Sequence, residues 1–143
     1  MTNLEKQYKN LPLEARMKLA VAPTIDPAYR VFMLHEQWMQ IKCYFARRAD
    51  LSAAEITHLS LDEDHVIRLC IAKRHDLSPE TVSRFVSDRD PNVRYFVARN
   101  PLLTEAQRER LMHDNDVLVR HAAKKGPRAI AYRQRPGQAK LVK

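Results

Sequence analysis

The sequence predicts an all-α protein, an α–α superhelix (solenoid) built from two-helix repeats of about 26 residues. The first observation is a column of basic residues at a constant spacing of 26: Arg16, Lys42, Arg68, Arg94 and Arg120. The second is that leucines and aspartates keep the same period, at Leu51, Leu77 and Leu103 and at Asp62, Asp88 and Asp114. A fixed period of about 20–50 residues is typical of proteins in which each unit buries its apolar face only against its neighbours.

The period divides the chain into consecutive segments. Clear repeats cover residues 51–76, 77–102 and 103–127, a degenerate repeat covers 25–50, and a partial repeat covers 1–24. Residues 1–127 therefore form the predicted solenoid, and residues 128–143 form a basic C-terminal tail that we expect to be flexible. There is no apolar run of about 18 residues, so we expect no transmembrane helix and no membrane partner. The polar N-terminus does not read as a signal peptide.

Each repeat is predicted to hold two short helices. In residues 77–102, Ser78 and Pro79 have the residue types of an N-cap and a first helical position. The second helix is expected at about residues 92–99, after Asp90-Pro91, with Val93, Phe96 and Val97 facing inward. The earlier segment 25–50 begins its first helix at Asp26-Pro27, and segment 1–24 is expected to retain only a second helix.

The last repeat departs from the pattern. Arg108 stands where the preceding repeat has Val82, and Lys124 where it has Ala98. We interpret both as polar drift at the end of the array, where no neighbour follows.

Charge is unevenly distributed along the chain. Residues 124–143 hold seven basic side chains and no acid, whereas the other residues carry 18 basic and 17 acidic side chains. The net charge of +8 therefore belongs mainly to the tail, which suggests an anionic partner there. Cys43 and Cys70 lie on apolar helical faces, which predicts reduced, buried thiols in a cytoplasmic protein.

One stretch resembles a known repeat family. Residues 90–94 read Asp-Pro-Asn-Val-Arg, residues 98–101 read Ala-Arg-Asn-Pro, and Leu103 begins the next helix. These elements resemble the leucine-rich repeat variant family, a relative of the HEAT and armadillo class, and the likeness covers roughly residues 26–127. It implies paired short helices in a right-handed superhelix and an interaction surface, but no reaction. One member type carries an iron–sulfur cluster on a cysteine-rich N-terminal segment; this chain has no cysteine before Cys43, so we expect no cofactor.

Two columns of charged residues are candidates for function. Asp62, Asp88 and Asp114 each precede a basic residue by six positions, so Asp62, Arg68, Asp88, Arg94, Asp114 and Arg120 predict an internal acid–base ladder. Alternatively, these arginines form a row that binds the phosphate groups of a ligand. The second column is Arg47, Lys73, Arg99 and Lys125. These cations suit the carbonyl ends of helices, or they line a groove for an anionic ligand, which makes them the best binding-site candidate in the sequence.

No pattern predicts catalysis or metal binding. The six histidines lack metal-ligand spacing, and the chain has no G-x-S-x-G or phosphate-binding glycine loop. Our preferred interpretation is a non-enzymatic helical-repeat scaffold that binds another macromolecule, with a protein partner preferred, through its concave face. The alternative is a nucleic-acid-binding protein that uses the second column and the tail. A weaker alternative is a relative of the bacterial HEAT-like alkylpurine DNA glycosylases.

Overall fold

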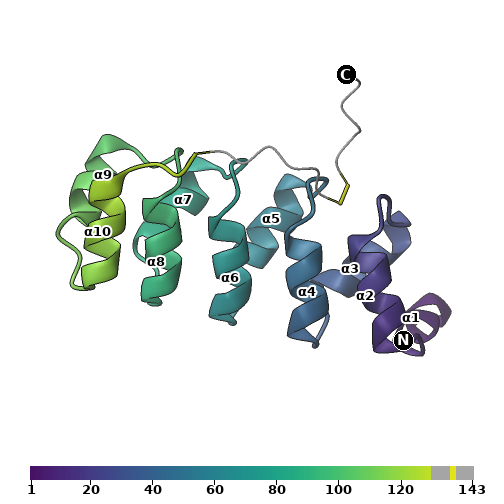
Figure 1. The fold of residues 1–143 in the computed structure, drawn as a ribbon. Coiled ribbons are helices and arrows are strands. Elements are labelled where there is room, and N and C mark those ends of the chain that lie inside the picture. Colours follow the sequence, from purple (N-terminus) through teal and green to yellow (C-terminus); the bar gives the residue numbers. More distant parts are fainter. Residues whose placement is uncertain (130–135, 138–143) are drawn as a thin grey trace, which may run out of the picture. The chain divides into compact units, whose positions relative to one another are not determined.

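The computed structural model describes residues 1–129 and 136–137, which contain ten α-helices and no strand (Figure 1). The all-α prediction is therefore confirmed over this part of the chain. The chain divides into two compact units, one of residues 1–59 with Pro136 and Gly137, the other beginning at Ser60. None of the described helices has the length and apolar character that crossing a membrane requires.

Every helix is short. The first unit contains α1 (Asn3–Lys9), α2 (Leu13–Val21), α3 (Pro27–Leu34), α4 (Met39–Ala46) and α5 (Ala53–Ser60), whose last residue belongs to the second unit. The second unit contains α6 (His65–Ala72), α7 (Pro79–Val86), α8 (Pro91–Ala98), α9 (Glu105–Leu111) and α10 (Val117–Lys125). Helices of seven to nine residues are too short to be stable alone in water, so tertiary contacts must hold them.

The helix boundaries keep the period of the sequence. Helices α2, α4, α6, α8 and α10 begin at residues 13, 39, 65, 91 and 117, and α3, α5, α7 and α9 begin at 27, 53, 79 and 105. Both series advance by 26 residues, which is consistent with a two-helix repeat. We call the α3 series first helices and the α2 series second helices.

Side-chain caps set these starting points. Asp64, Asp90 and Asp116 each accept a hydrogen bond from a backbone N–H in the first turn of the second helix that follows. Ser78 caps α7, and Pro79 occupies its first turn as expected. Thr104 with Gln107 forms a reciprocal capping box at α9. These helices thus begin where a turn side chain satisfies a free N–H group, whereas α2 and α4 begin without a side-chain cap.

Each unit has its own apolar core. In the first unit, α4 packs against α2 and α3, with Met33, Ile41 and Phe45 buried. In the second unit, α6, α8 and α10 lie side by side, and α8 also contacts α7 and α9 (Figure 1). The buried side chains there include Ile71, Val93, Phe85, Leu111 and Val119.

Two expectations differ from the structure. Residues 1–24 hold two helices, because Tyr8 on α1 is 2 % exposed and its ring lies 5.5 Å from that of Phe32 on α3. The sequence pattern indicates that Arg108 is a polar substitution at the end of the array, where no neighbour covers it. The side chain is instead buried, and its guanidinium donates to the carbonyls of Ala98 and Ala123.

A buried polar column that the sequence analysis missed follows the ends of the second helices. Arg48, with no exposed side-chain surface, donates to the carbonyls of Ala20 and Ala22 at the end of α2. Asn100, which occupies the same position two repeats further along the chain, donates to the carbonyls of Ala72 and Arg74 at the end of α6. These side chains satisfy helix-end carbonyls that have no partner within the helix.

Both cysteines lie in the described part of the chain, whereas most of the tail lies outside it. Cys70 is buried and Cys43 half-buried, and neither forms a disulfide, so the expected burial applies fully only to Cys70. The expected flexibility of residues 128–143 falls mainly on residues outside the described part. Within it, the N–H of Ala49 donates to the carbonyl of Pro136 at 2.9 Å. Gly137 has φ +79° and lies so close to the Asp50 carboxylate that a Cβ would collide with it.

Asn100→Ala should lower the free energy of unfolding by about 3 kcal/mol, because it leaves two buried carbonyls without donors. The control is Asn92→Ala, which removes an exposed side chain and should cost less than about 0.5 kcal/mol. Urea unfolding followed by circular dichroism measures both. Equal losses for the two variants would contradict the capping role.

The ion pairs of Arg30 predict acid sensitivity in the first unit. Arg30 donates to both carboxylate oxygens of Glu55 at 2.9 Å and to Asp50 at 3.2 Å. Burial raises the pKa of Glu55, but hydrogen bonds from Arg30 and Ser52 outweigh it, so the pKa lies below its ordinary value. The stabilisation by this carboxylate is therefore present above its unfolded pKa and is lost as pH falls through the lower folded pKa.

Glu55→Gln should be less stable than the wild type at pH 6, and the difference should shrink as pH falls below about 4. Urea unfolding followed by the fluorescence of Trp38, which lies in this unit, measures the difference. Glu14→Gln is the control, since Glu14 is exposed on α2. A Glu55→Gln deficit that stays the same at pH 3 and pH 6 would contradict the assignment.

Candidate binding surface

The first basic column holds the loops of the second unit together. Arg68 on α6 donates to the Asp88 carboxylate at 2.8 and 3.1 Å, and its other nitrogen donates to the carbonyl of Asp62 at 2.9 Å. The spacing of six that the sequence showed is therefore a side-chain-to-backbone contact. The carboxylate partner comes from the next repeat, 20 residues on. One guanidinium thus binds two successive loops.

The same geometry recurs one repeat later. Arg94 donates to Asp114 at 2.9 and 3.2 Å and to the carbonyl of Asp88 at 2.7 Å. Arg120 donates to the carbonyl of Asp114 at 2.8 Å. The described residues contain no repeat beyond α10, and among them Arg120 has no carboxylate partner. Asp88 and Asp114 also each accept an N–H from two residues ahead, at Asp90 and Asp116.

The first unit has its own version of this pair. Arg16 on α2 donates to both oxygens of Glu36 at 3.1 Å, again 20 residues ahead. Tyr8 donates its hydroxyl proton to Glu36 at 2.7 Å. Burial, together with this hydrogen bond to Glu36, raises the pKa of Tyr8 well above its ordinary value. Lys42 occupies the corresponding position on α4 and is half-buried.

These contacts favour the structural interpretation of the first column. The Arg68 and Asp88 side chains are 7 % and 8 % exposed, and those of Arg94 and Asp114 are 14 % and 10 % exposed. The hydrogen bond that Arg68 donates to the Asp88 carboxylate, as the largest cause, raises the pKa of Arg68. Guanidinium groups that are already bound to carboxylates and carbonyls have few donors left for a phosphate.

The second basic column lies at the carbonyl ends of the second helices. Arg47, Lys73 and Arg99 are the C-cap residues of α4, α6 and α8, and Lys125 is the last residue of α10. This position suits cations, because the helix dipole is negative there. Arg99 binds the end of the neighbouring helix: it donates to the carbonyl of Gly126, the C-cap of α10, at 2.6 Å. Arg47 and Lys125 are exposed and make no ion pair with described residues.

Part of this column lies beside the aromatic ring of Phe96. The Lys73 ammonium lies 4.3 Å from the centre of the Phe96 ring, and the Arg128 guanidinium carbon lies 5.7 Å from it. The N–H of Arg128 donates to the carbonyl of Arg99 at 2.8 Å, which ties the start of the tail to the end of α8. We call Lys73, Phe96, Arg99 and Arg128 the Phe96 cluster. Neither Phe96 nor Arg128 is among the predicted site residues, since the apolar spacing predicts that Phe96 faces inward.

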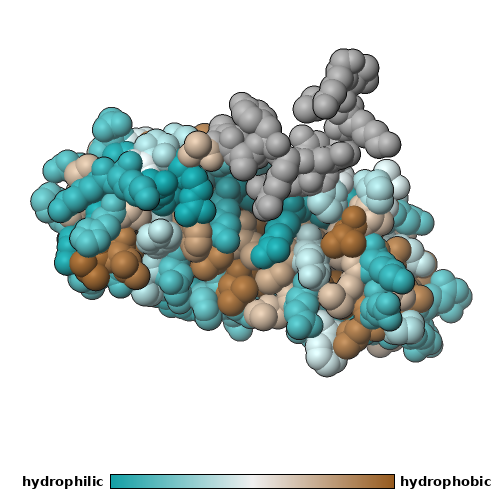
Figure 2. Space-filling model, viewed as in Figure 1, coloured by the Kyte–Doolittle hydropathy of each residue, from teal (hydrophilic) through white to brown (hydrophobic). Residues whose placement is uncertain are grey.

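The two ends of these helices differ in charge. The loops before α6, α8 and α10 carry seven acids: Asp62, Glu63, Asp64, Asp88, Asp90, Asp114 and Asp116. The opposite ends carry Lys73, Arg99, Lys124, Lys125 and Arg128. In Figure 2 hydrophilic residues cover the C-terminal end of α10, whereas hydrophobic ones show at its N-terminal end, where Val117 and Leu118 are 48 % and 61 % exposed.

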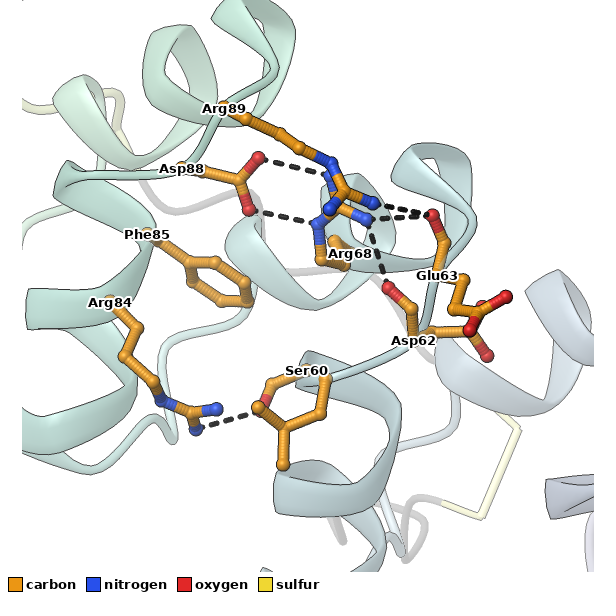
Figure 3. Close-up of a pocket in the computed structure, with 9 residues that line it drawn as sticks. Ser60, Asp62, Glu63, Arg68, Arg84, Phe85, Asp88 and Arg89 are labelled. Carbon is orange, nitrogen blue, oxygen red and sulfur yellow. Dashed lines mark hydrogen bonds and ion pairs between the residues drawn. The ribbon is translucent and has the colours of Figure 1, made fainter.

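A hollow of about 290 Å³ opens beside the ladder in the second unit. Figure 3 shows Arg84 pointing to Ser60 on one side, and the Arg68–Asp88 pair on the other, with Phe85 between them. Arg84 donates to the hydroxyls of Ser60 and Thr81. The polar groups drawn there mostly bind one another, so the hollow offers no pair of carboxylates arranged for acid–base chemistry.

The described residues contain no group of three metal-ligating side chains. The turn carboxylates are caps or ladder members, as the sequence analysis interpreted them. Comparisons with protein-family models, with curated proteins and with solved structures find no match for this chain. The resemblance to the leucine-rich repeat variant family therefore stays a prediction.

Arg94→Ala should lower the free energy of unfolding by about 3–5 kcal/mol, because it leaves the mostly buried Asp114 carboxylate without its cation. Arg120→Ala removes the same side chain from the same column, but there no carboxylate loses a partner, so the loss should be nearer 1 kcal/mol. Urea unfolding of both variants gives the comparison. A loss below about 1 kcal/mol for Arg94→Ala would remove the ladder interpretation.

Proposed function

We propose that this protein is a non-enzymatic α–α solenoid that binds a protein partner through the exposed face of its second helices. In this proposal the 26-residue units stack as repeats of the leucine-rich repeat variant type, and the second helices line the concave wall. A cytoplasmic location belongs to the same proposal.

One observation carries the proposal. Eleven large hydrophobic residues of the described chain are exposed, and seven of them lie on second helices or cap them: Leu13, Val21, Trp38, Met39, Tyr44, Val117 and Leu118. None of these seven side chains belongs to the buried core of its unit. Five of the seven lie on α2 and α4 or cap α4, and these helices pack against each other in the first unit; the other two lie on α10 in the second unit. Exposed apolar and aromatic residues supply most of the binding energy of protein-binding surfaces, which supports the proposal.

The basic residues support a second candidate function. Lys73, Arg99, Lys125 and Arg128 lie at one end of the second unit, and the sequence of the tail adds further cations. Nucleic acid is the alternative ligand for such a set, and its binding would weaken steeply with salt. Against it stands the acidic opposite end, about 12 Å away along an eight-residue helix. The glycosylase alternative stays a prediction that no structural observation favours.

Leu118→Asp should weaken partner binding by about tenfold or more, because it puts a charge into the apolar contact surface. Leu61→Asp is the matched control: Leu61 is 62 % exposed, against 61 % for Leu118, but it follows the first helix α5. Proteins captured by the full-length chain from nuclease-treated lysate are purified and titrated against all three forms. Circular dichroism checks that the variants are folded.

The outcome separates the candidate surfaces. Binding that survives Leu118→Asp but is lost in Leu61→Asp would overturn the second-helix face in favour of the hollow that Leu61 lines. Capture that disappears with nuclease treatment, and is restored by added nucleic acid, would overturn the protein partner in favour of nucleic acid.

A further inference from the structure

Arg120, the last arginine of the ladder, uses only part of its guanidinium. Its Nη1 donates to the carbonyl of Asp114 at 2.8 Å, just as Nη1 of Arg94 donates to the carbonyl of Asp88 at 2.7 Å. In Arg94 the Nε and Nη2 atoms bind the two oxygens of one carboxylate, at 2.9 and 3.2 Å. In Arg120 these two atoms make no hydrogen bond with the residues that the structure describes. The carbonyl contact therefore fixes Arg120 while its carboxylate-binding edge stays open.

Positions that are buried in the preceding repeat are more exposed around Arg120. Val86 is 3 % exposed and Ala98 is fully buried, where α9 and α10 pack against α7 and α8. The equivalent residues one repeat later are Met112, which is half-buried, and Lys124, which is exposed. Within the second unit, α9 and α10 form one end of the row of helices (Figure 1).

This end of the second unit also carries apolar surface. Val117, which is 48 % exposed, precedes Arg120 by three residues, and residues at that spacing are neighbours on a helix. Figure 2 shows hydrophobic surface at this end of α10. We call Met112, Val117, Arg120 and Lys124 the α10 end face. It combines a positioned guanidinium with apolar side chains, as a docking surface for a protein segment requires.

The acids of the loop before α10 are already engaged. The Asp114 carboxylate accepts hydrogen bonds from Arg94 and from the N–H of Asp116. The Asp116 carboxylate caps α10 and accepts two N–H groups of its first turn. Arg68 and Arg94 follow similar acidic loops, and each still binds one incoming carboxylate. These surroundings therefore tolerate a single carboxylate, whereas they would repel a long polyanion such as nucleic acid.

The chain itself is a poor source of that carboxylate. Residues 124–143 contain no acidic side chain. In a second copy of the chain, the ladder carboxylates of Asp88 and Asp114 are already bound to arginines. The open edge of Arg120 therefore favours an acid from a different protein.

We propose that the α10 end face binds an acidic loop of the protein partner. One carboxylate of that loop binds Nε and Nη2 of Arg120, and apolar side chains of the loop contact Met112 and Val117. This inference rests on the proposed function, because it specifies how one end of the second-helix surface holds its partner. The internal pairs of Arg68 and Arg94 show the geometry in which the carboxylate would bind.

The test uses the full-length chain, isotope-labelled for NMR, and a peptide with the sequence of residues 111–119. This segment contains the loop that Arg94 binds in the structure, so it offers a carboxylate in a form that the ladder already recognises. The Nε–H signals of Arg68, Arg94 and Arg120 are followed during the titration. Only the Arg120 signal should shift, because the other two guanidinium groups are already bound to carboxylates.

Matched comparisons isolate the carboxylate and the arginine. A peptide with asparagine in place of the first aspartate should bind at least about threefold more weakly, since an exposed ion pair contributes up to about fivefold. Arg120→Gln should weaken binding of the acidic peptide to a similar extent.

The control variant is Arg110→Gln, which removes an exposed cation from α9. Arg110 holds the position of Arg84, which reaches back to Ser60 of the preceding repeat, so its loss should change the affinity by less than about twofold. Backbone amide signals of Val117 and Lys124 give the dissociation constants, and thermal unfolding shows that each variant is folded.

Each outcome decides the proposal. Shifts at Arg120 that the asparagine peptide reproduces, or equal losses in Arg120→Gln and Arg110→Gln, would overturn it. A phosphoserine peptide that binds Arg120 more than about tenfold more tightly than the aspartate peptide would replace the carboxylate with a phosphate. An Arg120 signal that moves with protein concentration before peptide is added would replace the partner with a second copy.

The same measurements separate this inference from the proposed function. If the peptide does not bind, but partner binding still depends on Leu118, the proposed function stands and the assignment of the α10 end face fails. If the peptide binds at Arg120 through its carboxylate, but no partner depends on Leu118, the carboxylate site stands and the proposed function fails.

Discussion

The arginine ladder is the interaction on which the second unit depends. Its helices have seven to nine residues, and helices of this length do not persist alone in water. Arg68 and Arg94 each bind a carbonyl in one loop and a carboxylate in the next. The loops between first and second helices are thereby held in register, and the apolar side chains behind them meet. Replacing either partner leaves the other charge mostly buried and unpaired, so the arginine and the aspartate have to occur together.

The carbonyl ends of the helices pose a second constraint. Eight- or nine-residue helices leave up to four carbonyls unpaired, which is a large share of all their backbone groups. Arg48 and Asn100 satisfy these groups from the repeat that follows. At the last repeat the same column reaches Gly126, which has no side chain. Arg108 and Arg99 instead donate hydrogen bonds to the carbonyls of Ala123 and Gly126. Arg108, which interrupts the apolar pattern of the first helices, therefore binds a helix-end carbonyl that the missing side chain at position 126 cannot bind.

These two sets of contacts divide the charges of the second unit. Acids gather before the second helices, where they cap N–H groups, and cations gather after them, where they meet carbonyls. The structural needs of short helices therefore produce an acidic end and a basic end. The basic end becomes a candidate binding surface because Phe96 and the backbone near Gly126 hold its cations together. Partner binding would use charges that the fold already requires.

The sequence alone was sufficient for the helices and their period, because caps and apolar spacing act over a few residues. Asp90, Ser78 and Thr104 mark helix starts that the structure reproduces. A spacing also indicated that arginine and aspartate belong together, but tertiary structure decided that Arg68 binds the carboxylate 20 residues ahead and only the carbonyl six residues behind.

Burial was the property that the sequence could not decide. Arg48 and Arg108 look like surface cations, yet both are buried, because the unpaired carbonyls that bind them come from residues distant in sequence. Phe96 looks like a core residue, yet it is half-buried with cations from α6 and the tail over its ring. Local pattern determines which helix a side chain belongs to. The neighbours that fold against that helix determine whether the side chain is enclosed or left for a partner.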